Sequence, residues 1–199
     1  MPDETPASPV RRPRMTPQRE LELLTTTVEV LREVGYEALT MDAVATRAHC
    51  SKATLYRQWS GKPQMVAAAL YATRPVDASA IDTGTLRGDL IEFVTTLATQ
   101  TEKDTALIAG LAHVALTDAA LGQTLRETLF DPEQTHVRAF IDRAVERGEL
   151  PAQPAAAAFM PQLLFGALLS RPLLEGAYPD PDYLVRFIEA AILPALHHS

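Results

Sequence analysis

The sequence contains one cysteine and no asparagine among its 199 residues. A single cysteine excludes a disulfide scaffold and a zinc site built from several cysteines. The signatures G-x-S-x-G, G-x-G-x-x-G and H-E-x-x-H are missing, as is a phosphate-binding Walker loop. We therefore expect no metal site, no cofactor and no catalytic residues, and the sequence favours a function other than catalysis.

Signals for export or membrane insertion are also missing. No apolar run follows the basic residues Arg11, Arg12 and Arg14, so we expect neither a signal peptide nor an anchor at the N-terminus. Residues 150–170 are uncharged over 21 positions, a length that could span a bilayer. Three prolines, two glutamines and many alanines make this segment too polar for a convincing span. We interpret it as a helix buried in a protein interface, and we expect a cytoplasmic protein without a membrane partner.

Basic residues are fewer than acidic ones, 18 against 25, and they are unevenly placed. Residues 11–74 hold ten Lys and Arg against six Asp and Glu, whereas residues 75–199 hold eight against seventeen. A polyanion would thus be tolerated by the first part, with its net charge of +4, and repelled by the second, with its net charge of −9. The charge alone is equally compatible with an ordinary solvated surface.

The apolar residues, 47% of the chain, follow helical spacing, and strand alternation is missing. We predict an all-α fold of about nine to ten helices, with a disordered basic arm at residues 1–15 and a boundary at residues 75–85. Residues 16–74 then form one domain and residues 75–199 another. Cap residues, prolines and glycines place the helices at residues 17–35, 40–48, 52–59, 63–71, 85–100, 105–117, 119–129, 132–147, 154–175 and 181–196.

Two of these boundaries and one kink depend on single residues. Gly35 supplies a C-cap for the first helix, and Asp131 followed by Pro132 reads as an N-cap with proline in the first turn. Pro161 falls inside the helix expected at residues 154–175, so we predict a kink there.

The two short helices at residues 40–48 and 52–59 form a helix-turn-helix, joined by residues 49–51. On the second helix Leu55 and Trp59 share the inward face because they are four residues apart. The outward face carries small, hydroxyl, aromatic and cationic side chains, namely Lys52, Ala53, Tyr56 and Arg57, with Thr54 and Gln58 on the flanks. Such a face suits the major groove, where Lys and Arg reach guanine and methyl groups meet thymine.

These residues resemble a known family. The spacing and most residue types over residues 17–70 are similar to the N-terminal DNA-binding domain of the TetR family of transcriptional regulators. The residues that carry the resemblance are Ala38, Leu39, Thr40, Met41, Asp42, Val44, Ala45, Ala48, Ser51, Lys52, Thr54, Leu55, Tyr56, Arg57, Trp59 and Lys62. Chain length, helix number and an acidic second part are weaker points of agreement.

The resemblance implies roles for individual residues. The positions that usually contact phosphates correspond to Thr40, Ser51, Tyr56 and Lys62. The positions that face bases correspond to Lys52, Ala53, Thr54 and Arg57, with Gln58 at the edge. Thr40 and Ser51 would equally be explained by helix capping, and Tyr56 by covering the helix pair. For Lys52 and Arg57 the sequence suggests no structural role.

Two departures from the family pattern stand out. His49 replaces the usual glycine of the turn, so a non-glycine residue is expected to adopt a left-handed conformation. Gly61 and Pro63 replace the usual cap and acidic residue of the fourth helix, which makes the direction of Lys62 less certain. Cys50 is explained most simply by packing, and sensing roles for His49 or Cys50 remain minor alternatives.

The resemblance also implies a homodimer formed through the last two helices, a palindromic DNA operator and a small-molecule effector bound in the second part. We expect a repressor, because occlusion of a promoter requires only tight operator binding. Residues that we expect at the effector site are Phe93, His113, Phe130, Phe140, Phe159, Met160 and Phe165, although each taken singly is more simply explained as an ordinary core residue. The identity of the effector is not readable.

Three alternatives stay open from the sequence. An all-helical enzyme built on scattered carboxylates would leave the exposed Lys52 and Arg57 unexplained. A protein-binding adaptor without DNA binding would depend on the second part alone. The N-terminal arm, with Arg11, Arg12 and Arg14, is either a free tail or a segment that enters a flanking minor groove.

Overall fold

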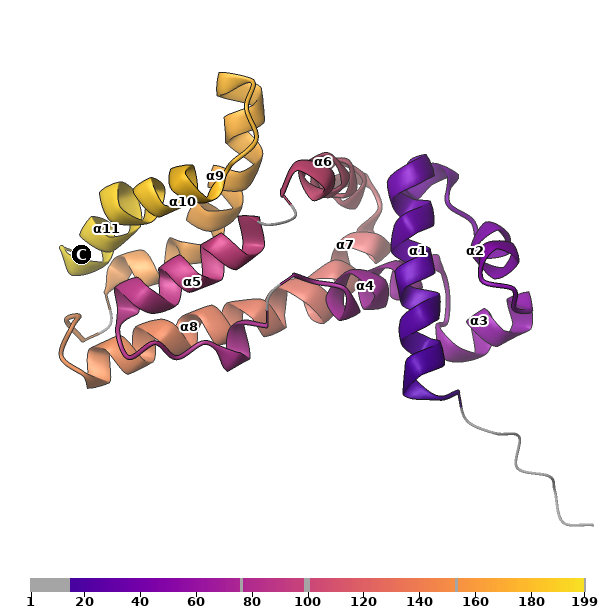
Figure 1. Ribbon diagram of the computed structural model, residues 1–199, viewed down its shortest axis with the longest axis horizontal. Helices are drawn as coiled ribbons and strands as arrows, with labels where there is room; N and C mark the ends of the chain where they lie inside the picture. The colour runs from indigo at the N-terminus through magenta and orange to yellow at the C-terminus, as the bar shows by residue number, and fades with distance from the viewer. Residues whose placement is uncertain (1–14, 76, 99–100, 153, 199) are drawn as a thin grey trace, which may run out of the picture.

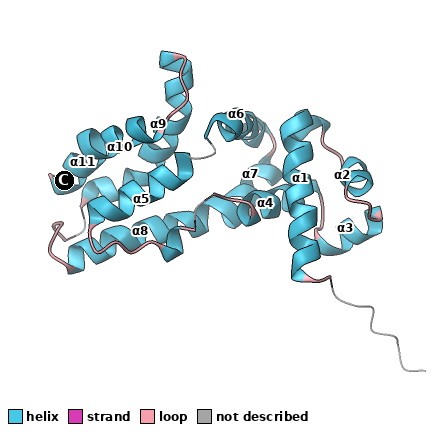
Figure 2. Cartoon of the chain, in the orientation of Figure 1, coloured by secondary structure: helices cyan, strands magenta, loops and turns pink. Residues whose placement is uncertain are grey.

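The computed structural model describes residues 15–75, 77–98, 101–152 and 154–198, and every regular element in these ranges is helical (Figure 2). The predicted all-α fold is confirmed. The molecule is elongated, with α1, α2 and α3 at one end and the C-terminal residues at the other (Figure 1). The predicted basic arm, with Arg11, Arg12 and Arg14, lies outside the described residues except for Met15.

Four helices form the N-terminal part, and the first three begin after hydroxyl caps whereas the fourth begins after Gly61. Their bounds are α1 (Pro17–Ala38), α2 (Met41–Arg47), α3 (Lys52–Gln58) and α4 (Lys62–Ala72). The side chains of Thr16, Thr40 and Ser51 accept hydrogen bonds from the backbone N–H three residues on, at 3.3, 3.1 and 3.1 Å. Gly35 has φ 74°, which interrupts the regular helix, and one further turn brings α1 to Ala38.

The remaining elements form the C-terminal part. They are η1 (Ala78–Ala80), α5 (Leu86–Ala98), α6 (Thr101–Thr117), α7 (Ala119–Leu125), η2 (Arg126–Phe130), α8 (Asp131–Glu146), η3 (Ala155–Phe159), α9 (Met160–Glu175), α10 (Pro181–Phe187), η4 (Ile188–Ile192) and α11 (Leu193–His197). Asp118 and Asp180 cap α7 and α10 through hydrogen bonds to backbone N–H groups.

The predicted break at Asp131 is wrong. Asp131 has helical φ and ψ, and α7, η2 and α8 follow one another without a cap. The turn η2 is π-helical, with the Asp131 N–H donating to the Arg126 carbonyl five residues back. Pro132 has no N–H and cannot donate to the carbonyl four residues back, as an ordinary helical residue does. In the wider π-helical turn this hydrogen bond is not needed, so the helix continues through Pro132.

The predicted kink at Pro161 is also wrong. Residues Ala155–Phe159 form a 3₁₀ turn, and Pro161 lies in the first turn of α9, where a missing N–H is tolerated. The proline inside α9 is Pro172. By length and composition the segment Ala155–Glu175 could cross a membrane. Only 11% of its most apolar stretch is buried inside the monomer.

Two hydrophobic cores hold the fold, and they do not coincide with the two parts of the chain. The second core joins α5, α8, α9, α10 and α11. The first core joins α1 to α4, but it also contains Leu111 of α6 and Leu121 and Leu125 of α7. Helices α6 and α7 therefore pack directly on the N-terminal part, between it and the second core (Figure 1).

The connection after α4 is fixed by a buried carboxylate. Asp89 of α5 is fully buried and accepts hydrogen bonds from the backbone and hydroxyl of Thr83, each at 2.7 Å. Arg143 of α8 donates to Asp89 Oδ2 at 2.9 Å and to the carbonyl of Ile81 at 2.8 Å. These bonds attach residues 81–83 to α5 and α8, so the connection has a defined path.

Candidate nucleic-acid interface and interdomain cavity

The inward residues of the helix-turn-helix fix its position on α1. Leu55 has no exposed surface and Trp59 retains 7%, as predicted from their spacing. Both belong to the core that contains Leu23 and Leu31 of α1. Because α3 is anchored along one side, its opposite side is held outward at the end of the molecule (Figure 1).

The turn between α2 and α3 has the predicted left-handed residue. His49 has φ 49°, the single positive φ of a non-glycine residue in the described ranges. Arg19 of α1 donates to the carbonyl of Ala48 at 2.6 Å, which holds the end of α2 against α1. Cys50 is half-buried against the first core, and burial raises the pKa of its thiol. A thiol with a raised pKa is less reactive, in agreement with a packing role.

The outward side of α3 presents most of the residues predicted to contact DNA. Lys52, Ala53, Tyr56, Arg57 and Gln58 are exposed, and Thr54 is half-buried. The exposed fraction of Tyr56, 47%, places it among the exposed large side chains. Ser51 and Thr40 are also exposed, although both hydroxyls accept capping hydrogen bonds.

The structure gives Lys52 a role that the sequence did not show. Its ammonium lies 2.9 Å from Asp42 Oδ2 on α2, and this hydrogen bond raises the pKa of Lys52. Gln58 donates to Glu20 of α1 at 3.0 Å. Arg57 differs from both, because its guanidinium has no hydrogen-bond or ion-pair partner among the described residues.

Lys62 lies at the junction of α1 and α4. Its ammonium donates to the Glu37 carbonyl at 3.2 Å and lies 4.3 Å from the centre of the Tyr36 ring, and burial lowers its pKa. Burial, together with the carboxylate of Asp118, raises the pKa of Tyr36 to about 12. Sequence reasoning missed Tyr36 and Asp118, because nothing in their spacing shows that α7 begins beside α1.

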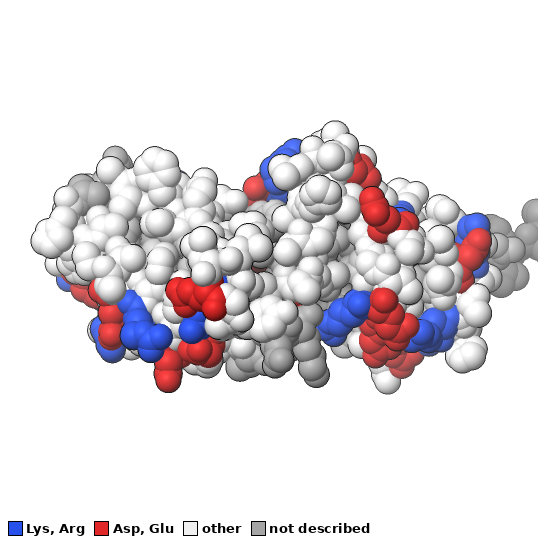
Figure 3. All heavy atoms as spheres, turned by 90° about the horizontal axis from the view of Figure 1, so that it is seen from above, with Lys and Arg blue, Asp and Glu red and all other residues white. Residues whose placement is uncertain are grey.

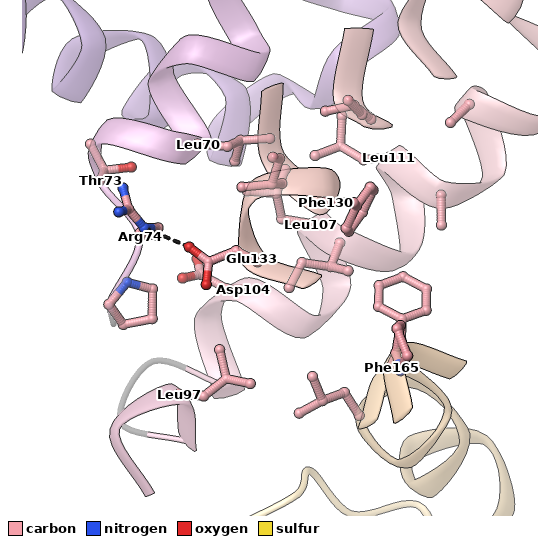
Figure 4. Close-up of a pocket in the computed structure, with 18 of the residues that line it drawn as sticks. Leu70, Thr73, Arg74, Leu97, Asp104, Leu107, Leu111, Phe130, Glu133 and Phe165 are labelled. Atoms are coloured by element: carbon pink, nitrogen blue, oxygen red, sulfur yellow. Dashed lines mark ion pairs between the residues drawn. The ribbon is translucent and has the colours of Figure 1, made fainter. Parts of the chain in front are cut away.

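A cavity of about 470 Å³ lies between the two parts of the chain (Figure 4). Its walls come from α1 and α4 on one side and from α5 to α9 on the other. Most of the lining is apolar, and Leu70, Leu107, Leu111, Phe130 and Phe165 face it in Figure 4. A concave, largely apolar site of this size can enclose a small molecule.

Three of the seven residues predicted at an effector site line this cavity, namely Phe93, Phe130 and Phe165. The other four lie elsewhere. His113 is exposed on α6, Phe159 is 60% exposed, and Phe140 and Met160 are enclosed in the second core. The sequence could not separate core from lining, because both types of residue recur at helical spacing.

Charged residues gather at one end of the cavity, and sequence reasoning did not predict them (Figure 4). Arg32 of α1 donates twice to Asp104 Oδ1 of α6, at 2.9 and 2.7 Å. Arg74, just after α4, lies 2.8 Å from Glu133 of α8, as the dashed line in Figure 4 shows. Each pair joins the N-terminal part to the C-terminal part.

Among the described residues no group of three or more His, Cys, Asp or Glu is arranged to hold a metal.

A compact helical domain with a short exposed helix after a tight turn defines a helix-turn-helix DNA-binding protein. Two family models match the chain. "Bacterial regulatory proteins, tetR family" covers residues 23–69, and "Tetracyclin repressor-like, C-terminal domain" covers residues 80–191.

Curated relatives agree with these matches. An HTH-type transcriptional regulator of Mycobacterium bovis is 32% identical over 181 residues, which cover 91% of this chain and 89% of that protein. A protein of Mycobacteroides abscessus named "DNA-binding transcriptional repressor TetR" is 34% identical over 183 residues, covering 88% and 92%. The chain belongs to the TetR family of DNA-binding transcriptional regulators and is not an enzyme.

Solved structures show the same fold. The crystal structure of a TetR family transcription regulator matches with a TM-score of 0.68 at 23% identity, covering 89% of this chain and 98% of that one. A TetR regulator from Haloarcula marismortui matches with a TM-score of 0.66 at 17% identity, covering 91% and 97%. The N-terminal helix-turn-helix domain and the helical C-terminal domain are thus arranged as in this family.

Proposed function

We propose that this protein is a cytoplasmic, homodimeric repressor that binds a palindromic operator and releases it when a small molecule enters the interdomain cavity. The observation that carries the proposal is the composition of the cavity wall. Residues of α1 and α4 in the DNA-binding domain and residues of α6 to α9 line the same space. A ligand there contacts both domains at once, so its binding energy can change their relative position.

The outward side of α3 supplies the proposed base contacts, from Lys52, Ala53, Thr54, Arg57 and Gln58. The hydroxyls of Thr40, Ser51 and Tyr56 are exposed around it and are proposed to contact phosphates, as is Lys62. Arg57 is the strongest candidate for a base contact, because a guanidinium that has no partner in the described part of the chain can pair with guanine. Lys62 would have to leave the Glu37 carbonyl to reach a phosphate.

The proposed dimer forms through α9 and the helix made by α10, η4 and α11. Leu173 and Leu174 near the end of α9 are 86% and 82% exposed, and the long apolar segment Ala155–Glu175 is mostly unburied in the monomer. Figure 3 shows few charged side chains on the face over α10 and α11. A second copy of the chain would cover this surface and place two α3 helices on successive turns of DNA.

A repressor role is supported by the relative from Mycobacteroides abscessus, whose name describes a repressor. We further propose that residues 16–74 act as the DNA-binding domain and residues 75–199 as the effector-binding and dimerisation domain. Coupling between them would pass through α4, which packs on α1 and on α7 and η2. Movement of α4 changes the separation of the two α3 helices in the dimer, so the operator no longer fits both.

Fluorescence anisotropy tests the DNA-binding part of the proposal. The purified protein is titrated into a labelled duplex from upstream of its own gene and into a random duplex, across a series of salt concentrations. We expect tighter binding to the first duplex, weakening with salt, and loss of the preference in the double variant Lys52→Ala, Arg57→Ala. Equal affinity of this variant and the wild type for the operator would contradict the proposal.

Sedimentation velocity tests the dimer. We expect the wild type to sediment as a dimer and the variant Leu173→Glu, Leu174→Glu as a folded monomer with weaker operator binding. The matched control is Leu116→Glu, because Leu116 is 86% exposed on α6, away from the proposed interface. A dimeric Leu173→Glu, Leu174→Glu variant would place the interface elsewhere.

A further inference from the structure

The charged end of the interdomain cavity contains a carboxylate that the protein leaves under-bonded. The Arg74 Nε and the Glu133 Oε1 lie 2.8 Å apart as an ion pair. Their alignment does not make a hydrogen bond, and neither carboxylate oxygen of Glu133 has one among the described residues. Burial raises the pKa of Glu133, while Arg74 and the nearby His136 lower it less strongly.

Arg74 is better satisfied than its partner. Its Nη1 donates to the Tyr71 carbonyl at 2.7 Å, and its guanidinium carbon lies 3.9 Å from the centre of the Tyr71 ring. Asp77 lies 3.5 Å from its Nη2. The Arg74 Nε also lacks a hydrogen-bond acceptor among the described residues, whereas both carboxylate oxygens of Glu133 lack a donor. The larger deficit at this end of the cavity is therefore a donor for the carboxylate.

The second ion pair argues against an anionic ligand. Both hydrogen bonds of Arg32 go to Asp104, so this guanidinium is already engaged. A ligand carboxylate at this end would meet two carboxylates, from Asp104 and Glu133, and two arginines that already have partners. A positive group would meet an under-bonded carboxylate at the end of a cavity whose remaining lining is largely apolar.

We infer that the effector is a compact apolar molecule bearing a protonated amine, which donates a hydrogen bond to Glu133 while its body lies against Leu107, Leu111, Phe130 and Phe165. This inference rests on the proposed function, because it assigns a ligand class to the same cavity. The amine would also compete with Arg74 for Glu133. Since Arg74 lies two residues after the end of α4, its release from α8 would free the end of this helix, which belongs to the proposed DNA-binding domain.

Three probes that share one apolar body test the inference. They are 4-butylbenzylamine, 4-butylbenzyl alcohol and 4-butylbenzoic acid, which are positive, neutral and negative at pH 7. Calorimetric titration measures the Kd of each probe for the full chain, and anisotropy measures release of operator DNA. The variant Glu133→Gln removes the charge, and Glu133→Asp retains it on a shorter side chain. The matched control is Glu146→Gln on the exposed side of α8.

We expect the amine to bind the wild type most tightly. Glu133→Gln weakens the amine roughly tenfold to a hundredfold and leaves the alcohol within about threefold, because one charge-assisted hydrogen bond is lost. Glu133→Asp keeps part of the preference, and Glu146→Gln behaves as the wild type. Thermal melts of all variants confirm folding. Equal binding of the three probes, binding unaffected by Glu133→Gln, or no binding of the amine would each overturn the inference.

The variant Ala112→Trp, which fills the cavity from α6, separates this result from the proposed function. If the alcohol or the acid binds, is excluded by Ala112→Trp and releases DNA, the cavity is an effector site and only the amine preference is wrong. If probes bind the wild type and Ala112→Trp equally well, or bind in the cavity without changing DNA affinity, the proposed function fails as well.

Discussion

The ammonium of Lys52 lies 2.9 Å from the carboxylate of Asp42, so the side chain that opens the exposed helix α3 is bound to the first turn of α2. Both side chains are more than half exposed. An ion pair in this position orients Lys52, but it also places a negative charge beside the surface that we propose contacts DNA. In the proposed complex Lys52 would exchange Asp42 for a base or a phosphate.

Replacing Asp42 by Asn should tighten DNA binding. The change removes the competing charge and frees Lys52, so we expect about a two- to fivefold lower Kd at low salt, with the difference shrinking as salt is added. Anisotropy titrations at several salt concentrations measure this. Asp142→Asn, which removes the same charge from the exposed side of α8, is the control. Weaker binding by Asp42→Asn would show that the ion pair organises Lys52 for DNA rather than competing with it.

Replacing Arg57 by Ala should weaken specific binding more than nonspecific binding. A guanidinium that reads guanine distinguishes bases, so we expect roughly a tenfold or greater loss for the operator and a smaller loss for a random duplex. The control is Arg138→Ala, an exposed arginine of α8 for which no partner is seen among the described residues. A uniform loss on both duplexes would instead assign Arg57 to a phosphate.

The left-handed conformation of His49 predicts effects of different size for two substitutions. We expect His49→Val to lower the free energy of unfolding by about 1–2 kcal/mol, because a β-branched residue is strained at φ 49°. We expect His49→Gly to change it by less than about 1 kcal/mol, since glycine removes the strain but has more freedom when unfolded. Urea denaturation measures both free energies of unfolding, provided that their dependence on urea concentration, the m-value, is the same in each variant. Equal stability of the two variants would mean that the turn adapts to its sequence.

Asp89 predicts a pH dependence of stability. Burial raises the pKa of Asp89, but hydrogen bonds from Thr83 and Arg143 outweigh it and hold the pKa below its usual value. The folded state then binds fewer protons than the unfolded state, so this stabilisation is present above about pH 4 and is lost as pH falls further. We expect Asp89→Asn to cost about 2–4 kcal/mol at pH 7 and to lack this component of acid lability.

Denaturant titrations between pH 3 and pH 7 compare the two proteins. The exposed Asp182→Asn in the first turn of α10 serves as the control for loss of a carboxylate. If Asp89→Asn lost stability on acidification as steeply as the wild type, the acid sensitivity would have to come from other carboxylates.

Local signals in the sequence were sufficient for the helix-turn-helix. The caps at Thr40 and Ser51, the inward pair Leu55 and Trp59, and the left-handed His49 each depend on neighbours within a few residues. Such features are decided by hydrogen bonds and sterics that the local sequence specifies. The same reasoning failed at Asp131, because a proline that usually begins a helix is also accommodated by a π-helical turn.

The cavity could not be predicted, because it depends on contacts between distant segments. Arg74 meets Glu133, and Arg32 meets Asp104, across separations that no spacing rule covers. Phe130 lines the cavity, whereas Phe140 is fully buried. Phe130 packs against Phe165 of α9 and Phe140 against Phe93 of α5, and a single sequence does not show which distant aromatic residue each one meets.

Val28, Arg32 and Leu70 lie in the wall of the cavity although they belong to α1 and α4, the helices on either side of the helix-turn-helix in the sequence. The two halves of this regulator are consequently not interchangeable modules. We expect a chimera that received residues 16–74 from a relative to acquire a new operator preference together with an altered cavity wall. Engineering a new operator preference without that side effect would require exchanging α2 and α3 alone, which contribute no residue to the cavity among the described lining.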